Sequence, residues 1–211
     1  MGSVIVAFSG GIDSSLVLKL AHDELGAQAV GITAVSPTLP ASELDATQKI
    51  AAEIGARHRI VETDQLQIPE FVLNDATRCY HCKTDLYSLL ETLRSEYADG
   101  YIVDGTNVDD LGDDRPGLKA ARERGVRSPL LEAGFSKADI RGVARELHLS
   151  NWDKPAAACL SSRIPRGITI TRSTLSRVER AEDALAQEGF RQYRVRDHGE
   201  IARIELAVEE L

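Results

Sequence analysis

Near the start of the chain, two glycines and several hydroxyl and acidic residues follow a short apolar run. The run covers residues 4–7, and the pattern consists of Ser9, Gly10, Gly11, Asp13, Ser14 and Ser15. Glycines let the backbone approach an anion closely, hydroxyls donate to it, and a helix that starts here points free N–H groups at it. Neither the Walker spacing nor Gly-x-Gly-x-x-Gly occurs, so we predict a loop that grips the pyrophosphate of ATP. A glycine-rich turn without a ligand is the alternative.

Three cysteines form the second chemical feature. Cys79 and Cys82 make a Cys-x-x-Cys pair, and Cys159 precedes the run 160–163, which ends in an arginine. The pair can be a redox couple, half of a zinc site with His81 as a further ligand, or part of an iron–sulfur cluster. Basic neighbours favour a reactive Cys159 thiolate, and small buried apolar residues are the alternative for all three. An odd number of cysteines argues against a disulfide framework.

Acidic residues follow the fourth predicted strand. They are Asp104, Asp109, Asp110, Asp113 and Asp114, with Gly105 and Asn107 between them. Carboxylates at a strand end beside a phosphate loop suit Mg²⁺, which takes oxygen ligands and bridges phosphates. The spacing does not select among the aspartates, and an acidic solvated loop is the alternative.

Two arginines near the end of the chain share one face of a predicted strand. Arg194 and Arg196 are two residues apart, so both side chains point the same way. Such a pair suits bidentate recognition of phosphate or carboxylate, although an exposed salt-bridged strand would look the same. Glu182 and Glu205 could join a metal or orient these arginines.

Residues 3–150 alternate short apolar runs with amphipathic stretches, which predicts an α/β fold with a parallel, Rossmann-like sheet. The predicted strands are residues 4–8, 29–34, 58–61 and 101–104. The predicted helices are residues 14–25, 41–54, 69–94 and 136–148, with capping residues at 41–45 and a capping box at Ser136 and Asp139. The strand ends place the phosphate loop at the edge where ligands collect.

The pattern changes after His148. Residues 151–171 have little periodicity and are predicted to be a long functional loop. A helix over 175–187, capped by Gly189, and strands over 192–195 and 200–206 predict a small α+β lobe. We therefore divide the chain into a nucleotide domain, residues 1–150, and a long functional loop with a small C-terminal lobe, residues 151–211.

The composition limits the partners. The chain has 211 residues, 43% of them hydrophobic, and a net charge of −8. That charge argues against nucleic-acid and membrane binding, while basic clusters at 163–166 and 191–196 suit a small anionic substrate. Without a bilayer-length apolar run or a signal peptide, we predict a cytoplasmic protein.

Taken together, these residues resemble the LarE-type ATP-dependent sacrificial sulfur transferases of the PP-loop ATP pyrophosphatase superfamily. The resemblance covers essentially the whole chain and rests on residues 9–15, 78–83, 104–107, 109–110, 115–117, 128–130, 152–155, 159–165, 194–196 and 202–205. The phosphate loop alone is shared with GMP, NAD and asparagine synthetases and with tRNA-thiolating enzymes. The later blocks are more specific.

The resemblance implies a step in making the nickel-pincer nucleotide cofactor of lactate racemase. A carboxylate of pyridinium-3,5-biscarboxylate mononucleotide would attack the α-phosphate of ATP, and a thiolate would then attack the acyl-adenylate. Cys159 would surrender its own sulfur and become dehydroalanine. Members with three cysteines in this arrangement instead hold a [4Fe-4S] cluster that carries an extra sulfide, and the resemblance favours that cluster here, on Cys79, Cys82 and Cys159.

The family's roles carry over to matching positions. The residues of the phosphate loop and Gly105 would bind the nucleotide with Mg²⁺; Arg163, Arg194 and Arg196 would bind the substrate anion; Glu182 and Glu205 would form a metal site. Family members assemble as homo-oligomeric trimers or hexamers. The chain lacks the family's leading helix and C-terminal segment, so we expect a weaker oligomer and an incomplete second metal site.

Two other functions remain open from the sequence. A tRNA-thiolating enzyme would share the loop and the cluster, but it should carry a basic surface or an RNA-binding domain. A nucleotide-binding regulatory module like the universal stress proteins would release no pyrophosphate and would have no use for Cys159.

Overall fold

Four parallel strands form the main sheet of the computed structural model, which describes residues 1–112, 116–156 and 158–210. The strand order is β3-β2-β1-β4, and the bounds are β1 Val4–Ala7, β2 Ala29–Val35, β3 Arg57–Glu62 and β4 Tyr101–Val103. Strand β1 lies inside the sheet, paired in parallel with β2 and with β4. The predicted α/β fold with a parallel sheet is confirmed.

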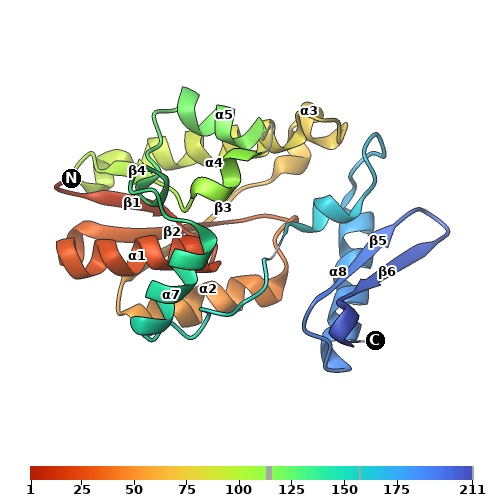
Figure 1. Cartoon of the computed structure of the whole chain (residues 1–211). Helices are drawn as coiled ribbons and strands as arrows, with labels where there is room; N and C mark the ends of the chain where they lie inside the picture. Colours follow the sequence, from red (N-terminus) through yellow and green to blue (C-terminus); the bar gives the residue numbers. More distant parts are fainter. Residues whose placement is uncertain (113–115, 157, 211) are drawn as a thin grey trace.

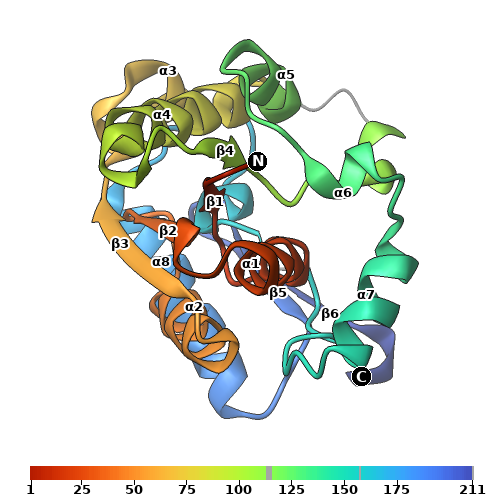
Figure 2. The same cartoon turned by 90° about the vertical axis from the view of Figure 1, so that its left-hand side faces the viewer.

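Helices cover both faces of this sheet (Figure 1). One layer contains α1 (Ile12–Leu25), α2 (Ala41–Ile54) and α7 (Lys137–Glu146), and the other contains α4 (Arg78–Leu93) and α5 (Pro116–Glu123). Alternate residues of β1 point to opposite faces. Val4 and Val6 therefore pack with α1, α2 and α7, whereas Ile5 packs with α4 and α5. Figure 2 shows the same two layers along another direction.

The predicted helix over residues 69–94 is two helices, α3 (Pro69–Val72) and α4. Asn74 lies in the break, has a φ of +55° and is fully buried. Its side chain bonds to carbonyls of a segment 90 or more residues away. The break therefore depends on a tertiary contact that local periodicity does not contain.

One of the two predicted helix caps is confirmed and the other is wrong. The capping box of Ser136 and Asp139 is present. The expected side-chain cap of α2 is wrong, because Pro40 occupies the N-cap position without a side-chain hydrogen bond. Helices α5 and α6 (Pro129–Glu132) were not predicted; each begins at a proline, a residue favoured in the first turn of a helix.

The rest of the chain forms a smaller unit beside the main sheet, blue in Figure 1. It contains α8 (Arg172–Gln187) and an antiparallel pair, β5 (Tyr193–Asp197) and β6 (Ala202–Leu206). The connecting residues are irregular except for a 3₁₀ turn at Leu160–Arg163. Leu160 and Ile164 pack with Phe71 of α3 and with α8, so an apolar cluster joins the smaller unit to the main one.

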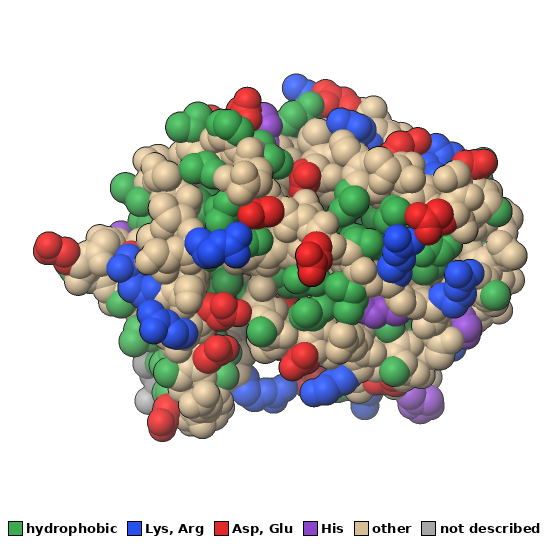
Figure 3. All heavy atoms as spheres, turned by 180° about the vertical axis from the view of Figure 1, so that it is seen from behind, with side chains coloured by type: hydrophobic (Ala, Val, Ile, Leu, Met, Phe, Trp, Pro, Cys, Tyr) green, Lys and Arg blue, Asp and Glu red, His purple; other side chains and the backbone are tan. Residues whose placement is uncertain are grey.

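The surface carries charges of both signs. On the face in Figure 3, Lys and Arg side chains are interspersed with Asp and Glu side chains. Among the described residues, no helix has the length and apolar character needed to cross a membrane.

Gly105 gives a test of this packing. A Cβ at Gly105 would lie 2.7 Å from the Ser14 backbone nitrogen and 2.9 Å from Asp13 Cβ. We expect Gly105→Ala to lower the free energy of unfolding by about 1–3 kcal/mol, as overpacking does. Gly142→Ala is the matched control: it lies inside α7 with no atom within 4 Å of its Cβ, so it should gain about 0.5–1 kcal/mol. Equal stabilities in denaturant unfolding would contradict this packing.

Candidate active site

The phosphate loop connects the buried strand β1 to helix α1. Gly10 has a φ of +70°, and a Cβ there would lie 2.9 Å from Thr47 Cγ2 on α2. The Ser14 hydroxyl donates to the Gly11 carbonyl at 3.1 Å and lies 3.1 Å from Ser9 Oγ. The loop is therefore held by hydrogen bonds between its own residues. Ser9 is exposed and Gly11 is half-buried on the side of the loop that faces solvent.

Ser15 lies behind this loop. It is fully buried, and its hydroxyl accepts a hydrogen bond of 2.9 Å from Asn151 Nδ2. The same Nδ2 donates to the Gly10 carbonyl at 3.0 Å. In this arrangement Ser15 supports the loop from the interior, and Asn151 is a contact that no spacing in the sequence indicates.

The end of strand β4 contacts the start of α1. Gly105 makes this approach possible, because any side chain there would meet the backbone of Ser14. Asp13 forms an ion pair of 2.5 Å with Lys137 of α7 and accepts a bond of 3.3 Å from Asn107 Nδ2. The segments after β1 and β4 are therefore held together at one edge of the sheet.

The predicted magnesium ligands have protein partners. Asp104 is buried and accepts from the hydroxyls of Tyr87, Thr106 and Ser128 at 2.7–3.0 Å. Asp109 accepts from the Lys137 backbone N–H at 2.6 Å, and burial with the nearby Asp104 carboxylate raises the pKa of Tyr87. Asp113 and Asp114 lie outside the described residues. Through these contacts, Asp104 ties the β4 end to its neighbours.

Cys159 lies on a segment that is bound to this same edge. Leu160 N–H donates to the carbonyl of Thr38, which follows β2, at 3.0 Å, and Cys159 Sγ lies 3.0 Å from Ser161 Oγ. Arg78 Nη1 donates to the Ser161 carbonyl at 3.0 Å. The segment is thereby held between the end of β2 and the first turn of α4.

The two cysteines of α4 have different surroundings. Cys79 is exposed, and Cys82 packs against the apolar cluster around Phe71. Burial, together with the nearby Cys159 and Cys79, raises the pKa of the Cys82 thiol to about 12. Cys82 is thus close enough to interact electrostatically with each of the other two cysteines, and it is a neutral thiol at physiological pH.

The sequence is similar to those of known proteins. Residues 2–90 match the asparagine synthase family. Over 204 residues the chain is 43% identical to the pyridinium-3,5-bisthiocarboxylic acid mononucleotide synthase of Lactiplantibacillus plantarum, an alignment that spans 96% of this chain and 74% of that protein. The chain belongs to the LarE-type family of PP-loop sulfur transferases.

Two uncharacterized proteins are also similar to this LarE-type chain. One, from Synechocystis sp., is 48% identical over 207 residues, which cover 98% of this chain and 77% of that protein. The other, from Methanocaldococcus jannaschii, is 32% identical over 203 residues, with 96% and 77% covered.

Two of the three predicted anion-binding arginines of this LarE-type chain contact Ser162, three residues after Cys159. Arg163 Nη1 donates to Ser162 Oγ at 2.8 Å, and Arg196 Nη1 donates to the Ser162 carbonyl at 3.2 Å. Ser162 Oγ in turn donates to the Cys159 carbonyl at 2.8 Å. Arg194 is exposed on β5, one residue before the buried Val195.

The two predicted metal-binding glutamates are paired with arginines. Glu182 is buried and accepts from Arg163 Nε at 2.7 Å and from the Val195 N–H at 2.9 Å. Glu205 pairs with Arg196 at 2.7 Å and with Arg203, and these guanidinium groups lower the pKa of Glu205 to about 2. Within residues 1–112, 116–156 and 158–210, no three His, Cys, Asp or Glu side chains are grouped as a metal site.

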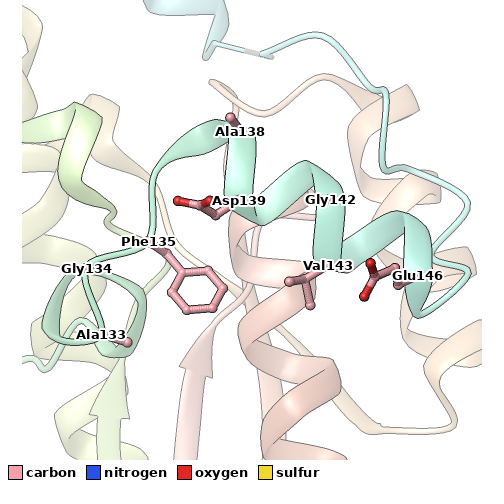
Figure 4. A pocket seen from close by; sticks show the side chains of 8 residues that line it. All are labelled: Ala133, Gly134, Phe135, Ala138, Asp139, Gly142, Val143 and Glu146. Atoms are coloured by element: carbon pink, nitrogen blue, oxygen red, sulfur yellow. The ribbon is translucent and has the colours of Figure 1, made fainter.

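A surface hollow of about 510 Å³ lies away from these residues, beside α7 (Figure 4). Ala133, Gly134 and Phe135 line one side, and α7 residues from Ala138 to Glu146 line the other. None of the predicted site residues lines it. Several of the residues that line this hollow have small side chains, which leave the space unfilled. The Asp139 side chain that lines it already accepts hydrogen bonds in the capping box.

The burial of Cys82 predicts an order of thiol reactivity. Because the thiolate is the nucleophile and the pKa of Cys82 is raised to about 12, Cys82 should react slowly with iodoacetamide at about pH 8. Its rate should rise about tenfold per pH unit as the pH approaches that pKa. The exposed Cys79 is the internal control. Peptide mass mapping measures both, and equal rates near pH 8 would contradict the structure.

Loss of each glutamate–arginine pair should lower the stability of the protein by a different amount. Glu182→Gln leaves the buried Arg163 without its counter-charge, so it should cost about 3–5 kcal/mol of unfolding free energy. Glu205→Gln, in the more exposed pair, should cost no more than about 1 kcal/mol. Denaturant unfolding measures the free energy of unfolding of both variants. An equal loss in the two variants would contradict the prediction that the buried pair stabilises the fold more than the exposed pair.

Proposed function

We propose that this chain uses ATP to activate a carboxylate of pyridinium-3,5-biscarboxylate mononucleotide and converts it to a thiocarboxylate. The observation that carries the proposal is the position of the Cys159 segment. Its first residue, Asn151, bonds to the phosphate loop, and the residues that follow Cys159 bond to Arg163 and Arg196. These contacts support a site that combines a nucleotide loop, a thiol and cationic groups.

Family membership supplies the order of the steps. A carboxylate oxygen attacks the α-phosphorus of ATP, and pyrophosphate leaves with the bonding electron pair. The loop N–H groups and the N-terminus of α1 favour that anion. The product is a mixed anhydride of the carboxylate with AMP, a far better acyl donor than the carboxylate itself.

Sulfur then replaces oxygen at the activated carbon. The Cys159 thiolate attacks the carbonyl carbon, AMP leaves, and a thioester joins the substrate to the protein. Loss of the Cα proton with cleavage of the Cβ–S bond releases the thiocarboxylate and leaves dehydroalanine at position 159. In this route each chain acts once.

We propose the exposed Arg194 and the half-exposed Arg196 as the contacts for the substrate phosphate or remaining carboxylate. Arg163 is less suited, because Glu182 already neutralises it in the interior. A metal at Glu182 or Glu205 would have to displace an arginine. The domain division at residue 150, the role of Mg²⁺ and assembly as a trimer or hexamer stay predictions.

A [4Fe-4S] cluster on Cys79, Cys82 and Cys159 is the second candidate for the sulfur source. The electrostatic interaction of Cys82 with both other thiols favours it. Their arrangement in the described residues does not fit it, because the three side chains do not form a group that could hold a metal there. The thiols would have to move together, so no step above uses a cluster.

Pyrophosphate and protein mass test the proposal together. Anaerobically prepared protein with ATP, Mg²⁺ and the biscarboxylate nucleotide should release pyrophosphate only when the nucleotide is present. Sulfur from Cys159 predicts a mass loss of about 34 Da, that of H₂S.

Two variants test the order of the steps and the source of the sulfur. Cys159→Ala should release about one pyrophosphate per chain and form no thiocarboxylate, because activation precedes sulfur attack. Cys79→Ala should behave like the parent if Cys159 is the donor. Repeated turnover at unchanged mass, lost in Cys79→Ala, would instead support the cluster. Absence of nucleotide-dependent pyrophosphate would overturn the proposed function.

A further inference from the structure

Asn151 joins the phosphate loop to the segment that leads to Cys159. Its side chain is 6% exposed, and one atom, Nδ2, donates to both the Gly10 carbonyl and the Ser15 hydroxyl. Its Oδ1 is buried and has no hydrogen-bond partner among the described residues. A buried amide with one half unpaired is unfavourable, so the contact made by its donor half needs an explanation.

The orientation of this amide follows from its partner. A backbone carbonyl only accepts hydrogen bonds, so the atom that faces Gly10 must be the NH₂ group rather than Oδ1. Ser15 Oγ can accept from the same group. The amide is therefore a donor to the loop and cannot be turned over without bringing two oxygens together.

The Gly10 carbonyl controls where the next N–H points. The described backbone contains no cis peptide bond, and in a trans peptide the C=O of one residue and the N–H of the next point in opposite directions. With the Gly10 carbonyl held inward by Asn151, the Gly11 N–H points toward the open side of the loop, where it donates a long bond of 3.4 Å to the exposed Ser9 hydroxyl, a contact that a phosphate oxygen can replace. Glycines on both sides of this peptide offer little resistance to a flip, and a flip would direct the carbonyl oxygen at the anion.

We infer that Asn151 is a positioning residue that locks the Gly10–Gly11 peptide with its N–H toward the phosphates of ATP. It acts through the loop and contacts neither nucleotide nor substrate. The inference rests on the proposed function, because it assumes that the loop binds ATP.

Binding measurements with three ligands test this role. The probes are α,β-methylene-ATP, which cannot release pyrophosphate, inorganic pyrophosphate, and AMP. Asn151→Asp keeps the shape but places a carboxylate oxygen against the Gly10 carbonyl, so the peptide should flip. Titration calorimetry should show about tenfold or greater weakening for the first two ligands, the loss expected for one hydrogen bond to a charged group. AMP affinity should change less than about twofold, because the loop grips the pyrophosphate portion.

Two further variants sharpen the comparison. Asn151→Ala removes the donor without adding repulsion, so its pyrophosphate affinity should fall between those of the parent and Asn151→Asp, and it covers the case in which the Asp variant does not fold. Ser150→Ala is the matched control. Its hydroxyl bonds to Glu53 on α2, at 2.5 Å, so it removes an anchor of the same segment without touching the loop, and its affinities should equal those of the parent.

The outcomes distinguish a failure of the positioning role from a failure of the proposed function. Equal loss of AMP and pyrophosphate affinity, or parental affinity in both Asn151 variants, would overturn the positioning role and leave the proposed function intact. Failure of the parent protein itself to bind α,β-methylene-ATP would overturn the proposed function, and the inference with it.

Discussion

One buried side chain, that of Asn74, holds the irregular segment around Cys159 against the body of the fold. Its Nδ2 donates to the carbonyls of Ile164, Pro165 and Ile168, and its Oδ1 accepts from Arg78 at 2.7 Å. Buried backbone groups need partners, and an irregular segment cannot supply them itself. A polar residue from the α3–α4 break meets that need and fixes the path of the chain.

Other anchors complete the arrangement. The segment is bound at its start by Asn151 to the phosphate loop, and at Leu160 to the end of β2 through Thr38. An apolar cluster packs the segment against α8. Because each anchor reaches a different element, the thiol is held in a defined place without a helix or strand to carry it, as reactions between positioned groups require.

The sequence predicted the elements whose signals are local. The four strands, the exact span of α2 and the capping box at Ser136 follow from apolar periodicity and capping chemistry within a few residues. The break at Asn74 and the contacts of Asn151 could not be predicted, because each joins residues that are far apart in the sequence. The same limit applies to Ser15, whose pattern indicated an anion ligand, whereas its buried hydroxyl accepts a hydrogen bond from the distant Asn151.

Burial decides which predicted arginines are free for a ligand. Arg163 and Glu182 form a pair with side chains 8% and 11% exposed, so an anion that took Arg163 would leave a buried carboxylate without its counter-charge. Arg196 shares its carboxylate with Arg203 at a site open to water, where exchanging one anion for another costs little. The buried pair therefore positions Ser162 and the backbone of Cys159, and the substrate anion is proposed to bind at β5, where Arg196 can change partners without leaving an unpaired charge in the interior.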